Sequence, residues 1–198
     1  MKFEQFEMKS PNNKLNNEKP PFLYHGSPNN LEIIKPSQKH IRDESEGLLV
    51  FGTPDKAFAS MFLSPRTDES WSTKGRLNSV YYIVIDDEKR FRESDKGGVI
   101  CQFSNNKFTC DKTKGMKDLE WTSKEEVKPS NITEHKSSLD TMMDNGVQVY
   151  FVDKEILIDL KNAIRNNSDH GRSILVGLQS ENQKQNKNIK SFISSDNH

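Results

Sequence analysis

The chain has few of the features that would assign it to a specialised class of protein. Its 198 residues include only two cysteines, and its 29 basic side chains balance its 29 acidic ones. Two cysteines are too few for a disulfide framework, and they favour a reducing compartment. The balanced charge gives the chain no general attraction to nucleic acid or to an anionic membrane.

Long apolar runs and metal-binding or phosphate-binding motifs are also missing from the sequence. No apolar run approaches the length that crosses a bilayer, and the N-terminus has no signal-peptide stretch. The five histidines are scattered and have no Cys or acidic partners at metal-ligand spacing. We therefore expect a monomer that binds neither membrane nor metal. We expect it in the cytoplasm, or delivered to another cell by a route without an N-terminal signal peptide.

Hydrophobic residues make up only 32% of the chain, which indicates that part of it lies outside a packed core. Residues 1–20 are polar and rich in Asn and Lys, so we expect a flexible N-terminal extension. Residues 166–198 are rich in Asn, Gln, Ser and Lys, and predict a polar, disordered tail. The alternative for the tail is a docked C-terminal segment, because residues 174–176 are apolar. The expected domain spans 21–165.

Short apolar runs alternate with turn signals through this domain. The pattern predicts strands over 22–25, 48–52, 80–85, 119–122 and 147–152, with helices after Thr53, over 138–144 and after Asp153. A hairpin turning at Asn105-Asn106 would place Cys101 opposite Cys110, as two buried thiols or as a cross-strand disulfide. Strands outnumber helices and are joined by hairpins. The predicted class is α+β, built around a mainly antiparallel sheet.

Three short motifs follow one another along the chain in an order that is typical of one enzyme superfamily. They are Tyr24-His25-Gly26-Ser27 at the end of a strand, a strand–helix unit over 49–63, and Leu119-Glu120-Trp121 followed by Val127-Lys128-Pro129. Together they resemble the ADP-ribosyltransferase superfamily, and more narrowly its His-Tyr-Glu branch of diphtheria-type toxins and poly-ADP-ribose polymerases. The resemblance covers residues 22–129. It implies a split, mainly antiparallel β-sheet core with short helices.

The resemblance also implies NAD as the substrate and assigns residues to it. His25 would bond an adenosine ribose hydroxyl, the backbone of Gly26 would bind the nicotinamide amide, and Glu120 would be the catalytic acid residue. Strand alternation favours this role for Glu120, because a core-facing Leu119 and Trp121 would turn it to the opposite side. A carboxylate beside the ribose stabilises the positive charge that forms there as the bond to nicotinamide breaks. The alternatives are that His25 has only a structural role and that Glu120 is an ordinary solvent-exposed strand residue.

One expected residue is missing from the pattern. The tyrosine that stacks on nicotinamide in the family should lie in the second strand, where this chain has Val50 and Phe51. Phe51 would supply an aromatic face without the hydroxyl, and Ser27 and Thr53 complete the expected NAD-binding set. A basic stretch between the first two strands contains Arg42, which would hold the pyrophosphate. The alternative for this stretch is a solvated loop.

The function implied by the resemblance is transfer of ADP-ribose from NAD to an unknown protein or nucleic-acid acceptor, with release of nicotinamide. Such an enzyme would act as a toxin or effector, or within its own cell. The alternative is a catalytically inactive module on the same fold that binds NAD, another nucleotide or a protein. RNA 2′-phosphotransferases share the fold and the His-Gly, but they need several basic side chains that this chain does not clearly show.

Overall fold

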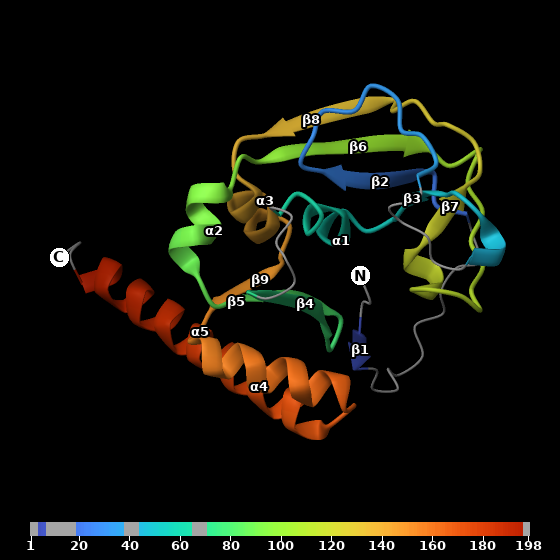
Figure 1. Cartoon of the computed structure of the whole chain (residues 1–198). Coiled ribbons are helices and arrows are strands. Elements are labelled where there is room, and N and C mark those ends of the chain that lie inside the picture. Colours follow the sequence, from blue (N-terminus) through green and yellow to red (C-terminus); the bar gives the residue numbers. More distant parts are fainter. Residues whose placement is uncertain (1–3, 7–18, 38–43, 65–70, 196–198) are drawn as a thin grey trace.

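The structure is a computed structural model of the whole chain, and it describes residues 4–6, 19–37, 44–64 and 71–195. Two layers of strands, with helices between them and below them, make up the molecule (Figure 1). The fold is mixed α/β with short helices, and it contains both antiparallel and mixed sheets. The predicted combination of antiparallel strands and short helices is confirmed, and the parallel pairings at both edges of the mixed sheet were not predicted.

The first sheet layer carries the candidate site. Strands β2 (Phe22–Ser27), β6 (Gly98–Ser104) and β8 (Asn131–His135) pair in antiparallel order. Strands β3 (Val50–Gly52) and β7 (Trp121–Ser123) form a second antiparallel pair. A single bridge between Tyr24 and Thr53 joins the two groups. The layer therefore runs in the order β8-β6-β2-β3-β7.

The second sheet is mixed and lies below the first (Figure 1). Its order is β1 (Glu4–Phe6), β4 (Ser72–Leu77), β5 (Val80–Ile85) and β9 (Gln148–Phe151). Strands β4 and β5 form a hairpin whose turn residues Asn78 and Ser79 both have positive φ, as a two-residue turn between twisted strands requires. The two outer pairings, of β1 with β4 and of β5 with β9, are parallel.

Helices fill the space between the sheets and cover the outer face of the second sheet (Figure 1). Helices α1 (Lys56–Ser60) and α3 (Ser138–Asp144) contribute buried side chains to a central core shared with β5 and with Phe91 of α2 (Glu88–Ser94). Helices α4 (Lys154–Arg165) and α5 (Asp169–Ser195) pack on the opposite face of β4, β5 and β9. Two single turns of 3₁₀ helix, η2 (Glu44–Glu46) and η3 (Lys117–Leu119), precede β3 and β7.

Local signals predicted several elements well. The strand over 80–85 and the helix over 138–144 have the predicted bounds. The helix predicted after Thr53 has Asp55 as its N-cap, and the Asp55 carboxylate accepts from Ala57 N and Phe58 N. The hydroxyl of Thr53 accepts from Asp55 N instead, so the two side chains accept from different backbone donors.

The expected hairpin at Asn105-Asn106 is absent. The side-chain amide of Asn105 donates to the carbonyl of Pro20, and Thr109 pairs with Thr122 of β7 instead of with β6. Segment 107–110 therefore crosses to a different strand, and the tilted rings of Phe103 and Phe108 pack with their centroids 5.6 Å apart. Both cysteines are free thiols. Cys101 is fully buried and Cys110 is partly buried.

The structure also differs from the expectation for the two ends of the chain. Within 1–20, residues 4–6 form β1, which pairs in parallel with β4; residues 7–18 lie outside the described residues. Within 166–198, residues 169–195 form α5, so this segment is not a disordered tail through the described residues. The cause is burial of Leu175, which is 2% exposed and packs in the cluster that contains Leu157 and Leu160.

Candidate functional site

Strands β2 and β3 separate at His25. Before that point Tyr24 N donates to Thr53 O at 2.7 Å, and Thr53 N donates to Tyr24 O at 2.9 Å. A continuing antiparallel ladder would next join Gly26 to Phe51. Instead, Nδ1 of His25 donates to the carbonyl of Phe51 at 2.8 Å. The imidazole therefore takes the acceptor that the ladder would have used, and the ladder stops.

Gly26 lies at this point of separation. The N–H and C=O of Tyr24 point toward β3, and those of Gly26, two residues further along β2, point to the same side. The other constraint on Gly26 comes from α1. A Cβ at this position would lie 2.0 Å from the carbonyl oxygen of Ala59. Close packing against α1 therefore requires glycine at position 26, independently of any role of its backbone in binding a ligand.

Glu120 occupies the junction between η3 and β7, so the predicted strand over 119–122 is wrong at its start: Leu119 ends η3, and the strand begins at Trp121. Its Oε2 accepts a hydrogen bond from the backbone N–H of Met116 at 2.7 Å, which fixes the carboxylate relative to the loop before it. The backbone at Glu120 is extended, with φ −121° and ψ 104°. Because Trp121 packs against the cluster around Leu23 and Phe103, strand alternation directs Glu120 to the other face.

Strand register shows which candidate residues share a face. Gly52 pairs with Trp121, so Glu120 lies beside Thr53 at the end of the pair. Counting along the strands places five residues on the face that looks toward α1: Tyr24, Gly26, Phe51, Thr53 and Glu120. The Cβ of His25 lies on the opposite face, as the partner of Cys101, and its ring turns sideways to Phe51.

Two hydroxyls of the expected NAD-binding set have local structural partners. Ser27 is buried, and its Oγ accepts from Asn29 N at 3.1 Å, closing the turn after β2. Thr53 is also buried, and its Oγ1 accepts from Asp55 N at 3.2 Å. Arg42, expected at the pyrophosphate, lies outside the described residues.

A cluster that the sequence did not indicate lies at the start of α1. Tyr81 donates its hydroxyl proton to Asp55 Oδ2 at 2.9 Å, and the guanidinium of Arg76 stacks over the Tyr81 ring. Burial and the Asp55 carboxylate raise the pKa of Tyr81 far above its usual value, so its hydroxyl stays protonated. The Nε of Arg76 is buried without a hydrogen-bond partner among the described residues. Only the pairing of β4 with β5, which places Arg76 opposite Tyr81, reveals this cluster.

The free thiol next to His25 is not placed for nucleophilic chemistry. Cys101 pairs with His25 across β2 and β6 but is fully buried. Burial raises the pKa of the Cys101 thiol to about 11. A reactive cysteine needs a thiolate near neutral pH, so a Cys–His pair here is excluded on chemical grounds.

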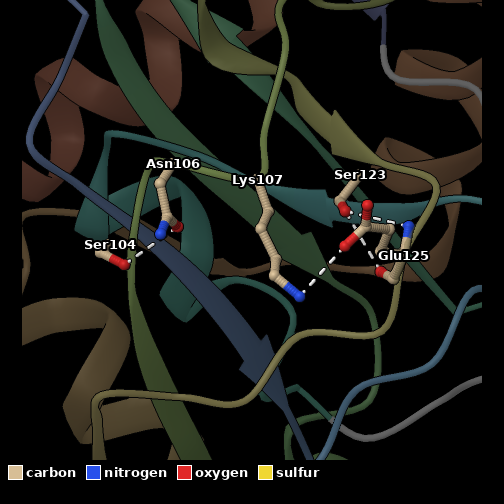
Figure 2. A network of polar contacts seen from close by, with 5 residues as sticks. All are labelled: Ser104, Asn106, Lys107, Ser123 and Glu125. Carbon is tan, nitrogen blue, oxygen red and sulfur yellow. Dashed lines mark hydrogen bonds and ion pairs between the residues drawn. The ribbon is translucent and has the colours of Figure 1, made fainter.

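An open groove of about 490 Å³ lies beside β7. Charged and hydroxyl side chains dominate its lining: Ser45, Glu46, Leu49, Lys107, Thr109, Asp111, Lys114, Thr122, Ser123, Lys124 and Glu125. Figure 2 shows Lys107 extending to Glu125, with Ser123 next to it, and the Lys107–Glu125 ion pair is 3.1 Å long. A second ion pair joins Lys114 to Glu46 at 3.2 Å.

Within the described ranges, no three His, Cys, Asp or Glu side chains come together as a metal site would need. None of the described helices combines the length and the apolar character that a membrane crossing requires. No family model, characterised protein or solved structure matches this chain.

Proposed function

We propose that this protein transfers ADP-ribose from NAD to a macromolecular acceptor, on a fold of the ADP-ribosyltransferase type. The observation that carries the proposal is the separation of β2 from β3, where His25 takes the Phe51 carbonyl and leaves the Gly26 backbone directed toward β3. Nicotinamide carries a carboxamide that can both donate and accept. A paired N–H and C=O on one residue is complementary to it.

The side chains on the same face match the other needs of the reaction. Breaking the bond between ribose C1 and nicotinamide leaves positive charge on the ribose, while nicotinamide departs with the electron pair. A fixed carboxylate stabilises that charge, and the Met116 N–H holds Glu120 in one position. Phe51 and Tyr24 lie on this face as well, so either ring can stack on nicotinamide in place of the family's tyrosine.

The second candidate is a module on the same fold that binds NAD or another partner without catalysis. Two observations favour it. Phe51 lacks the tyrosine hydroxyl, and the hydroxyls of Ser27 and Thr53 are occupied by local backbone groups. A nucleotide site without its usual polar partners binds but does not position the ribose for cleavage.

Two measurements on the purified protein separate these functions. Calorimetry with NAD tests binding, and chromatography of nicotinamide released from NAD tests cleavage. Transfer predicts both binding and release, whereas the inactive module predicts binding alone. If NAD neither binds nor is cleaved, both forms of the NAD-site proposal are wrong.

A further inference from the structure

The groove beside β7 adjoins the face that carries Glu120. Thr122 lines the groove and follows Glu120 by two positions, so both side chains lie on one side of the strand. Two positions along a strand are about 7 Å apart. On the neighbouring strand, Leu49 lines the groove two positions before Phe51. The groove is therefore an extension, along both strands, of the proposed NAD site.

The charges of the groove are mixed and balanced. Its lining includes three lysines and three carboxylates: Lys107, Lys114, Lys124, Glu46, Asp111 and Glu125. Lys107 and Glu125 are both well exposed, with 49% and 69% of their side-chain surface accessible. Exposed ion pairs of this kind contribute little to stability, so their members can exchange partners with a ligand.

We infer that this groove docks an extended polypeptide segment carrying charges of both signs, and that this segment bears the acceptor side chain. The inference rests on the ADP-ribosyl transfer proposed above. In that reaction a nucleophilic atom of the acceptor forms a bond to ribose C1, nicotinamide leaves with the electron pair, and the acceptor proton passes to solvent.

The lining disfavours other classes of ligand. The three lysines of the groove give it no net positive charge for the phosphates of a nucleic acid, because Glu46, Asp111 and Glu125 balance them. Small apolar ligands select pockets lined mainly by hydrophobic side chains, and this lining is mostly charged or hydroxylated. A polypeptide supplies backbone N–H and C=O groups for the hydroxyls of Thr109 and Thr122, together with charges for the ion-pair members.

Binding is tested on the full chain in the absence of NAD. The probe is a fluorescent synthetic peptide of alternating Lys and Glu around one Ser, and the competitor is a single-stranded RNA oligonucleotide. The double variant Lys107→Glu, Lys124→Glu reverses two exposed groove charges and should weaken peptide binding about tenfold. The matched control Lys89→Glu reverses an 85% exposed lysine on α2 and should bind as the unaltered protein does.

Nicotinamide release by the unaltered protein is measured separately and tests the proposed reaction. Binding of the peptide that depends on Lys107 and Lys124 supports the docking site. Absence of peptide binding, equal binding by the double variant, or preferential binding of the RNA would overturn it. Groove-dependent peptide binding without nicotinamide release would support the docking site and contradict the proposed transfer.

Discussion

At the scale of single residues, His25 has a structural contact through Nδ1 and a predicted contact with the adenosine ribose of NAD. Nδ1 donates to the carbonyl of Phe51, and this bond determines the orientation of the ring and which nitrogen carries the proton. The same bond lies next to the Tyr24–Thr53 bridge, where β2 and β3 stop pairing. His25 therefore has a structural role at the end of the β2–β3 pairing and a predicted role in binding the adenosine ribose. The two roles predict different effects of removing its side chain.

The variant His25→Ala should weaken NAD affinity by about 1–3 kcal/mol, because one partner of a desolvated hydrogen bond is lost. It should also lower the free energy of unfolding, since the Phe51 carbonyl loses its donor. Calorimetry and thermal unfolding measure the two effects. The control is His170→Ala, which removes an exposed imidazole paired with Asp159 far along the chain. A purely structural His25 would change unfolding but leave NAD affinity equal in all three proteins.

At the scale of elements, α1 and β2 approach so closely that Gly26 cannot carry a side chain. The variant Gly26→Ala should destabilise the protein by about 1–3 kcal/mol, because the added Cβ would lie 2.0 Å from Ala59 O and α1 would have to move. Gly177→Ala is the matched control, since nothing lies within 4 Å of its added Cβ in α5. That control should stabilise the helix by about 0.5–1 kcal/mol. Equal unfolding midpoints for the two variants would contradict the close packing.

Asp95 connects the end of α2 to the start of α3. Its carboxylate accepts from Ser138 N at 2.8 Å, Leu139 N at 3.1 Å, Ser137 Oγ at 3.0 Å and Gly97 N at 2.9 Å. Partial burial alone would raise the pKa of Asp95, but the backbone donors prevail and hold it below its usual value. The charged carboxylate is therefore the form that stabilises this junction.

The variant Asp95→Ala should lose about 1–3 kcal/mol of unfolding free energy at neutral pH. Because the native pKa is depressed, the contribution of Asp95 is fully present above about pH 4, the unfolded value, and is lost as the pH falls through the native value. The difference between wild type and variant should therefore shrink in acid. Urea unfolding across this pH range measures it, with Asp140→Ala, an exposed carboxylate of α3, as the control. A constant difference at all pH values would be incompatible with the depressed pKa.

Sequence signals that act within a few residues made the helices and strands predictable. The parts of the site that depend on which strands pair could not be predicted from the sequence. The apolar run over 80–85 and the capping serine before 138 act within a few residues, so their elements follow from the sequence. The face shared by Gly26, Phe51 and Glu120 also follows from strand alternation once the strands are known. The partner of Thr109 and the Arg76–Tyr81 cluster depend on which strands pair, and no local pattern indicates that choice.

At the scale of the whole molecule, α5 belongs to the folded domain. Leu175 is 2% exposed and contributes to the cluster that covers the second sheet, whereas its neighbour Val176 is 42% exposed. A polar composition concealed this, because the apolar side chains that dock the helix, Ile174, Leu175 and Leu178, lie within a few residues of one another. Composition averages over a segment, but packing depends on the positions of a few side chains.

The variant Leu175→Ala should therefore destabilise the protein by about 2–5 kcal/mol through the lost burial and the cavity that remains. Val176→Ala, one position along and facing solvent, should change stability by less than about 0.5 kcal/mol. Chemical denaturation of both variants measures the contrast. If Leu175→Ala were as stable as Val176→Ala, residues 166–182 would not contribute to the core.

The central claim concerns Glu120 and is tested most directly by nicotinamide release. The variant Glu120→Gln keeps an oxygen that can accept from Met116 N, so the loop should retain its position. It removes the negative charge beside the ribose, and we predict that release from NAD falls by roughly a hundredfold or more while NAD affinity changes little. Equal rates for wild type and Glu120→Gln, or no release by wild type, would contradict the account.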